Sequence, residues 1–154
     1  MKWFWVMAFA IGACAEAQRP YQFTAPTSAE DPVDVVSRAL AQSGYAPSGV
    51  DRQTGIVVTK WEDTGFLYGK VQGVNATIVR RYTATVAKSP DAGQVQVQLR
   101  ADVQRCQQGS YAIGDVEVRG SCERMDGLVG KHQKELDSLG VKLQQSLAAP
   151  AAAP

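Results

Sequence analysis

Residues whose chemistry could support catalysis are sparse in this 154-residue sequence. The one histidine, His132, falls beside the apolar stripe of an expected helix, where packing explains it better than catalysis does. Glu62 and Asp63 are adjacent, so on an extended segment they point to opposite faces and cannot act as a pair. Both are better explained as acidic residues of a turn. The sequence has no glycine-rich phosphate loop, nucleophile elbow or metal-ligand spacing, so we expect neither an enzyme nor a bound cofactor or metal.

The first 13 residues have the composition of a signal peptide. Lys2 precedes nine consecutive apolar residues, which run from Trp3 to Ile11, and small residues follow. A basic start, a short apolar run and small residues at the cleavage site are typical of secretory signal peptides. A membrane-spanning helix needs roughly 20 apolar residues. This apolar run is therefore too short to cross a bilayer.

The segment Ile11-Gly12-Ala13-Cys14 resembles the lipobox of bacterial lipoproteins. The resemblance implies cleavage before Cys14, a diacylglycerol on its sulfur and an acyl chain on the new amino terminus. Several acyl chains give stable anchoring in a membrane. An aspartate after the cysteine would imply retention at the inner membrane, so Ala15 implies the outer membrane, with the domain facing the periplasm. The alternative is an ordinary signal peptide with a cysteine near its cleavage site.

Lipidation of Cys14 would leave the other two cysteines, Cys106 and Cys122, as a pair. Export places them in an oxidising compartment, where disulfides form and persist. We therefore expect a disulfide that closes a short loop, worth about 3 kcal/mol in the chain-entropy model. Two metal-binding thiols are the alternative, but no further ligands cluster near them. Because Cys106 continues the polar register of its strand, the bridge is expected on the outer side of the sheet.

The charge of the chain argues against some classes of partner. The sequence has 16 Lys and Arg residues and 15 Asp and Glu residues, and loss of Lys2 with the signal peptide leaves a formally neutral chain. A neutral chain without a basic run is poorly suited to bind nucleic acid or an anionic membrane surface. We therefore expect contact with the membrane through the lipid anchor, and no nucleic acid partner.

Composition divides the sequence into four parts. Residues 1–13 are the expected signal peptide, and residues 14–30 hold the lipidated cysteine and a polar, proline-containing flexible tether. Residues 31–147 are long enough to bury one modest core, and they form the expected single domain. Residues 148–154 contain only alanine and proline, which predicts a disordered tail.

Hydrophobic periodicity predicts the elements of the domain. Asp31-Pro32 is typical of a helix start. Apolar residues from Val95 to Val103 alternate with polar ones, as in a strand with one buried face. The expected elements are a helix at 32–43, strands at 55–61, 76–88 and 94–104, a weaker strand within 111–119 and a helix from Ser121. Their order predicts an α+β fold, a two-layer sandwich of helix, three or four antiparallel strands and helix.

A polar set of side chains could bind a partner. Arg81 lies on the polar face of one expected strand, and Gln96, Gln98 and Arg100 lie on the polar face of the next. Neighbouring strands would bring the four residues together on one surface. A solvated outer face is the simpler explanation for this pattern.

An aromatic set could do the same. Trp61 and Tyr68 lie at the start of, and within, the expected hairpin connection at 62–75. Together they could form an exposed aromatic patch of the kind that marks interaction sites. Trp61 could equally cap the core at the end of its strand.

Residues 33–61 resemble the opening of the BamC-type helix-grip domains. A helix leads through Gly44-Tyr45 and a D-x-x-x-G turn, here Asp51 to Gly55, into a strand that ends at Trp61. That family occurs in lipoproteins of the outer-membrane β-barrel assembly machinery. The resemblance implies a fold more than a function, because it covers this segment alone and the cysteine pair is not part of the family's pattern.

These observations favour a non-enzymatic envelope lipoprotein that acts as a binding or scaffolding module for another cell-envelope protein. The alternative is a lipoprotein that binds a small ligand or envelope polymer in a cleft between the helices and the 62–75 connection. A hydrolase is a third class, and it would need a polar pocket around His132.

Overall fold

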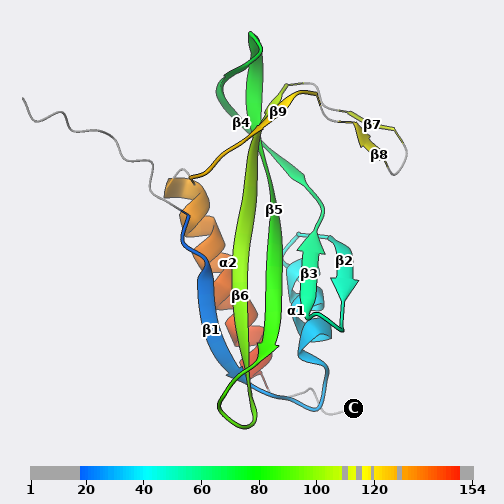
Figure 1. Ribbon diagram of the computed structural model, residues 1–154, viewed down its shortest axis with the longest axis vertical. Coiled ribbons are helices and arrows are strands. Elements are labelled where there is room, and N and C mark those ends of the chain that lie inside the picture. The colour runs from blue at the N-terminus through cyan, green and yellow to red at the C-terminus, as the bar shows by residue number, and fades with distance from the viewer. Residues whose placement is uncertain (1–17, 109–110, 114–115, 119, 128–129, 150–154) are drawn as a thin grey trace, which may run out of the picture.

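The computed structural model describes residues 18–108, 111–113, 116–118, 120–127 and 130–149 (Figure 1). Its strands are β1 (Tyr21–Pro26), β2 (Pro47–Asp51), β3 (Ile56–Thr59), β4 (Glu62–Val71), β5 (Val74–Lys88), β6 (Gln94–Gln107), β7 (Tyr111–Ile113), β8 (Val116–Val118) and β9 (Cys122–Arg124), and its helices are α1 (Pro32–Gln42) and α2 (Gly130–Ala148). The predicted signal peptide, Cys14 and most of the predicted alanine–proline tail lie outside the described residues.

Two long antiparallel strands, β5 and β6, form the axis of the molecule (Figure 1). Toward the turn that joins them, β1 pairs with β6, while β3 pairs with β5 and β2 with β3. Toward the other end, β9 pairs with β6 and β4 with β5. The long hairpin therefore carries two successive pairs of flanking strands in one seven-stranded antiparallel sheet.

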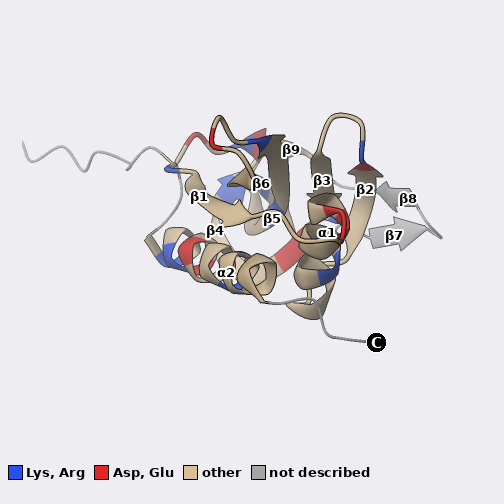
Figure 2. Ribbon diagram, turned by 90° about the horizontal axis from the view of Figure 1, so that it is seen from below, with Lys and Arg blue, Asp and Glu red and all other residues tan. Residues whose placement is uncertain are grey.

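Both helices pack on one face of the part of the sheet that contains β1 and β3 (Figure 2). Alternation along β5 and β6 directs their apolar side chains toward the helices, as the period-2 pattern of residues 94–104 predicts. The core is a single cluster of sheet and helix side chains that includes Phe23, Leu40, Val57, Tyr82, Val97, Leu99, Leu136 and Leu143.

The helix expected at 32–43 is confirmed as α1. The Asp31 side chain accepts a hydrogen bond from the Val33 amide at 2.8 Å, and Pro32 occupies the first turn. Gly44 follows the helix at φ +93°, a conformation that favours glycine. The strands expected at 76–88 and 94–104 are confirmed as β5 and β6, each somewhat longer than predicted.

The α+β class is confirmed, but the predicted order of helix, three or four strands and helix is wrong. The main sheet has seven strands and dominates the fold, and one strand precedes α1. Three of the added strands, β2, β4 and β9, are short or rich in glycine and acidic residues. Such segments show no local alternation, so pairing with the neighbouring strands is what orders them.

The prediction of a flexible tether at 14–30 is also wrong for its second half, which contains the strand β1. Residues of β1 pair with β6, with Phe23 opposite Val97 and Ala25 opposite Val95. Both Phe23 and Ala25 are buried. The strand ends at Pro26, and a proline is tolerated here because β1 lies at the edge of the sheet.

The hairpin connection expected at 62–75 is largely strand. β4 runs to Val71 and turns into β5 through Gln72 and Gly73, at φ +50° and +81°. Two residues with positive φ are typical of the tight turn that matches the twist of a hairpin.

The helix expected from Ser121 begins later, at Gly130. Residues Cys122–Arg124 form β9 instead, because they pair with β6. The weaker strand expected within 111–119 is two short strands, β7 and β8, that pair only with each other in the described residues.

A disulfide joins Cys106 and Cys122, as predicted. The two residues are directly opposite each other on β6 and β9, with Cα atoms 4.0 Å apart. Cys106 keeps the register of the polar residues of β6 and lies outside the core cluster, which supports the predicted place of the bridge on the outer side of the sheet. Cys106 is fully buried, however, whereas the polar register predicts an exposed residue. Thr77 of β5, which pairs with Cys106, is buried on the same face of the sheet. Cys122 of β9 pairs with Cys106 from the other side of β6.

Candidate functional site

The buried arginine Arg80 joins four elements of the fold. Its guanidinium donates to Oε2 of Glu62 on β4 at 3.3 Å, to the Tyr45 hydroxyl after α1 at 3.4 Å and to Oε2 of Glu135 on α2. Nδ1 of His132, also on α2, lies 3.2 Å from Nη1 of the arginine. The side chain of Arg80 is 8% exposed. We call these five residues the Arg80 cluster.

The Arg80 cluster keeps a buried cation by surrounding it with acceptors. A buried charge is tolerated only when it is paired and hydrogen-bonded. Burial of Glu135 by itself raises the pKa of its carboxyl group, but the hydrogen bond and positive charge of Arg80 outweigh burial and hold that pKa below its ordinary value. Glu135 is therefore a carboxylate committed to the arginine.

Aromatic rings complete the surroundings of the guanidinium. The Arg80 Cζ atom lies 5.8 Å from the ring centroid of Tyr45 and 5.5 Å from that of Tyr82. Both distances permit a cation–π attraction. Burial raises the pKa of Tyr82 well above its ordinary value, and its hydroxyl has no hydrogen-bond partner in the described part of the chain.

His132 is a packing residue of this cluster, in line with the sequence interpretation. It is 3% exposed, and Nδ1 lies 3.1 Å from Oε2 of Glu135. Its ring meets that of Phe66 on β4 edge to face, with centroids 6.4 Å apart. Among the described residues, no group of His, Cys, Asp or Glu side chains is arranged to hold a metal ion.

Glu62 and Asp63 belong to β4, so the predicted acidic turn is wrong, but they do point to different partners. Glu62 binds Arg80, whereas Asp63 accepts from the Thr77 hydroxyl at 3.2 Å and from the Gly65 amide at 2.9 Å. The adjacent carboxylates therefore do not form a pair.

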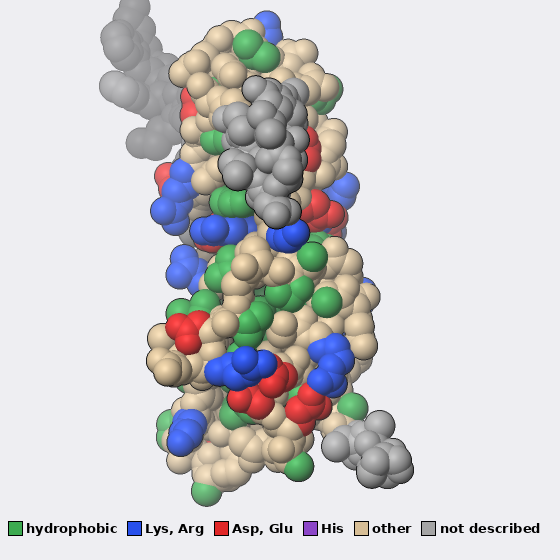
Figure 3. All heavy atoms as spheres, turned by 90° about the vertical axis from the view of Figure 1, so that its right-hand side faces the viewer, with side chains coloured by type: hydrophobic (Ala, Val, Ile, Leu, Met, Phe, Trp, Pro, Cys, Tyr) green, Lys and Arg blue, Asp and Glu red, His purple; other side chains and the backbone are tan. Residues whose placement is uncertain are grey.

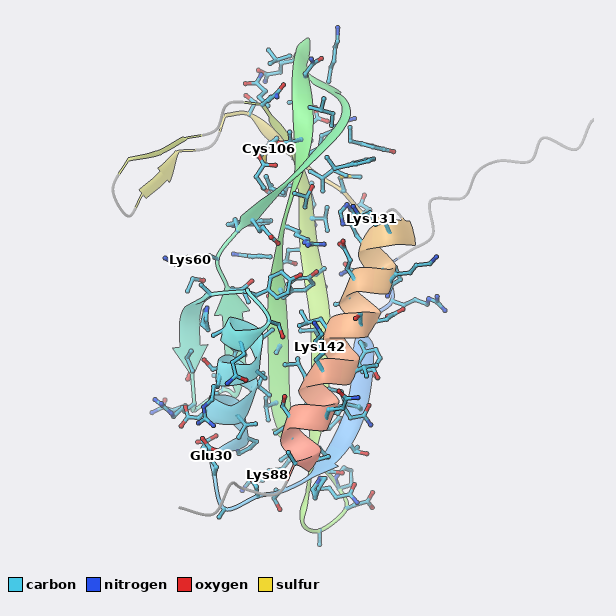
Figure 4. All side chains as sticks on the ribbon, turned by 180° about the vertical axis from the view of Figure 1, so that it is seen from behind. Glu30, Lys60, Lys88, Cys106, Lys131 and Lys142 are labelled. Carbon is cyan, nitrogen blue, oxygen red and sulfur yellow. A yellow bond between two sulfur atoms is a disulfide. The ribbon has the colours of Figure 1, made fainter. Side chains whose placement is uncertain are left out.

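A groove of about 450 Å³ opens beside the Arg80 cluster, between the end of α1 and the length of α2. We call it the α1–α2 groove. Figure 4 shows the two helices in front of the sheet, with Lys131 near the start of α2 and Lys142 further along it. The groove is lined by Ser43, Tyr45, Lys131, Lys134, Glu135, Ser138, Leu139 and Lys142.

The polar set predicted from the sequence does share the sheet face opposite the helices. Thr83 pairs with Arg100 and Thr85 with Gln98, while Gln96 lies opposite Ala87. Arg81 is engaged within this face, because its Nε donates to Oδ2 of Asp102 at 2.9 Å. The face is therefore polar and carries a local ion pair, and binding of a partner on it stays a prediction.

The structure places Trp61 and Tyr68 in different surroundings. The Arg81 guanidinium lies over the Trp61 ring, 4.7 Å from its centroid, so Trp61 covers the polar face and does not cap the core. Tyr68 stacks on Phe66 instead, with ring centroids 6.4 Å apart. The predicted two-residue patch is thus replaced by a different aromatic group.

That group lies where β4 and β5 extend beyond the helices (Figure 1). Phe66, Leu67, Tyr68 and Val74 are 42%, 56%, 41% and 45% exposed. We call these four residues the hairpin tip. In Figure 3 a few hydrophobic side chains are visible at this upper end beside a basic one, and acidic and basic side chains are interspersed over the middle and lower parts of the view.

Sequence reasoning missed the groove lysines and, apart from Tyr68, the residues of the hairpin tip. The positions 131, 134, 138 and 142 do repeat at helical spacing, so a second stripe on α2 could have been found. The hairpin tip carries no such pattern, because glycines at 65 and 69 interrupt the strand.

Comparisons with known proteins yield a structural likeness alone. No family model matches the sequence, and no curated protein matches it. A DUF4468 family protein from Bacteroides ovatus is similar in structure, with 11% sequence identity, a TM-score of 0.46 and 88% of each chain covered. In the described residues, no helix is long and apolar enough to cross a membrane.

Proposed function

We propose that this protein is a non-enzymatic, lipid-anchored binding module of the cell envelope, which docks on another envelope protein through the hairpin tip. The exposed apolar tip is the observation that carries this proposal. Clustered large apolar side chains are costly to leave in water, and aromatic residues are enriched in protein interfaces.

The position of the hairpin tip supports docking on a partner. The tip projects beyond the two helices, so its apolar side chains can reach a partner without rearrangement of the core (Figure 1). The Phe66 ring packs edge to face against the buried ring of His132 on α2. A preorganised aromatic anchor loses little conformational freedom on binding.

The lipid anchor is supported by the resemblance of Ile11-Gly12-Ala13-Cys14 to a lipobox. Five residues after Cys14, Arg19 is hydrogen-bonded to Gln133 on α2. The Arg19 amide donates to Oε1 of Gln133 at 3.2 Å, and Nε2 of Gln133 donates to the Arg19 carbonyl at 3.0 Å. The four residue-to-residue steps from Cys14 to Gln18 span at most about 14 Å when extended. A lipid on Cys14 would hold the domain close to its membrane.

The non-enzymatic part of the proposal is supported by the Arg80 cluster. His132, Glu135 and Glu62 are the groups that could move a proton, and all three contact the buried arginine. The Arg80 guanidinium holds the pKa of Glu135 below its ordinary value, so Glu135 is a weak general base.

A substitution at Cys14 tests the anchor. We expect the full-length Cys14→Ala protein to leave the membrane fraction or to stay unprocessed. The control is Cys106→Ala/Cys122→Ala, which lacks the disulfide but keeps Cys14 and should remain in membranes. Unchanged processing and membrane association of Cys14→Ala would contradict lipidation.

Site-specific photo-crosslinking tests docking. A photoreactive amino acid is placed at Leu67 of the full-length chain in intact bacterial cells, and at Val50 on β2, which is also exposed, as the control. We expect a discrete protein adduct from position 67 that Phe66→Ser abolishes, and none from position 50. Adducts to lipid only, or the same adducts from both positions, would overturn docking through the hairpin tip.

A further inference from the structure

The α1–α2 groove gathers positive charge around a hollow surface. Lys131, Lys134 and Lys142 all line it, and all three are exposed. We infer that this groove binds an elongated ligand that carries at least two carboxylate or phosphate groups. The inference goes beyond the proposed docking function and does not depend on it, because the hairpin tip contributes no residue to the groove.

Helical geometry places the lysines along one line. Positions 131, 134, 138 and 142 repeat every three or four residues, so their side chains share one face of α2. At 1.5 Å per residue, Lys131 and Lys142 are about 16 Å apart along the helix axis. A compact ion such as a single phosphate cannot contact both ends, whereas an extended ligand with spaced anionic groups can.

The acidic residue in the groove does not cancel this charge. Glu135 forms its ion pair with Arg80, and its Oε2 atom also contacts Nδ1 of His132. In the described part of the chain, no acidic side chain forms an ion pair with Lys131, Lys134 or Lys142. The lysine ammonium groups are therefore available to an incoming anion.

The remaining walls suit the uncharged parts of such a ligand. Ser43 and Ser138 offer hydroxyl groups, and Leu139 forms a buried apolar base. Tyr45 is held in place because its hydroxyl accepts a hydrogen bond from Nη2 of Arg80. Few polar groups at fixed positions beside an apolar base are typical of small-ligand sites. The observed lining differs from the predicted cleft, because residues 62–75 take no part in it.

Calorimetric titration of the full-length protein in a neutral detergent tests the inference with three probes. Tetragalacturonic acid supplies spaced carboxylates, inorganic tripolyphosphate supplies phosphates, and maltotetraose is the uncharged control. We expect at least one anionic probe to bind and maltotetraose not to bind. The stronger of the two anionic probes identifies which anionic group the groove prefers.

Two double variants locate the site. Lys134→Gln/Lys142→Gln should weaken binding at least tenfold. Lys60→Gln/Lys88→Gln removes the same charge from two exposed lysines outside the groove and should change binding less than twofold. Glutamine keeps a high helix propensity at positions 134 and 142 of α2, and Lys60 and Lys88 are exposed, so melting curves should show both variants folded. Equal weakening by the two pairs, or no binding of either anionic probe, would overturn the inference.

Discussion

The ring of Tyr21 in β1 occupies the space that a side chain at Gly140 in α2 would need. A Cβ atom at Gly140 would lie 2.2 Å from Cδ1 of Tyr21 and 2.4 Å from its Cγ. The Tyr21 hydroxyl also donates to Oε1 of Gln144, one turn further along α2, at 3.2 Å. The glycine that weakens the helix in isolation is therefore what allows β1 and α2 to approach each other.

Gly140→Ala should lower the free energy of unfolding by about 1–2 kcal/mol, because overpacking costs more than the helix gains. In a Tyr21→Ala background the same change should raise it by about 0.5–1 kcal/mol, since only the helix propensity remains. Urea unfolding of the four proteins of this cycle measures both effects. The same loss of stability in both backgrounds would rule out the contact as its cause.

The Arg80–Glu135 ion pair should make stability depend on acid pH. The pKa of Glu135 is lower in the folded protein than in the unfolded chain, where it is about 4.3. The stability that the ion pair contributes is therefore present above about pH 4.3 and is lost as the pH falls through the folded-state pKa. Glu135→Gln should therefore reduce the urea midpoint at pH 7 more than at pH 3. In an Arg80→Met background this pH-dependent difference should disappear, and its persistence there would contradict the assignment.

Tyr82→Phe should raise the free energy of unfolding by about 1 kcal/mol, because it removes a buried hydroxyl without a partner and keeps the ring beside Arg80. The raised pKa of Tyr82 supplies a second readout. The stability that this raised pKa contributes is present below about pH 10, the pKa of tyrosine in the unfolded chain, and is lost at higher pH. The variant, which lacks the hydroxyl, should therefore lose less stability than the wild type between about pH 9 and 11. Guanidinium unfolding across this range would reveal a destabilised variant if the hydroxyl has a partner.

Gly55→Ala should strongly lower the free energy of unfolding, because a Cβ atom at position 55 would lie 2.0 Å from the Val86 carbonyl oxygen. Gly65 is the matched control: its φ of +66° resembles the +71° of Gly55, but nothing lies within 4 Å of a Cβ there. Gly65→Ala should cost about 1 kcal/mol for the backbone conformation alone. Gly55→Ala should cost about 3 kcal/mol more, since β5 must shift. Similar melting temperatures for the two variants would contradict this difference.

Loss of the disulfide should lower the free energy of unfolding by about 3 kcal/mol in Cys106→Ala/Cys122→Ala, since the bridge closes a loop between residues 16 apart in the sequence. Wild-type protein in reductant should show a similar loss, while the variant should not respond to reductant. Thermal unfolding with and without dithiothreitol makes the comparison.

Local patterns in the sequence sufficed for the elements whose own residues carry the information. The Asp31-Pro32 start, the alternation from Val95 to Val103 and the leucine spacing from Leu136 onward specify α1, β6 and α2. The cysteine pair was predictable because only two cysteines remain beyond the amino-terminal segment. Each of these features depends on near neighbours in the chain or on composition.

Tertiary structure alone decided the features that depend on distant residues. β1, β4 and β9 are strands because the long β5–β6 hairpin offers unpaired backbone groups on both sides. Arg80 interrupts an apolar register, and its role emerges only when Tyr45, Glu62 and Glu135 converge on it from three other elements. A buried charge needs partners from wherever the fold can bring them, and spacing along the chain does not record which ones arrive.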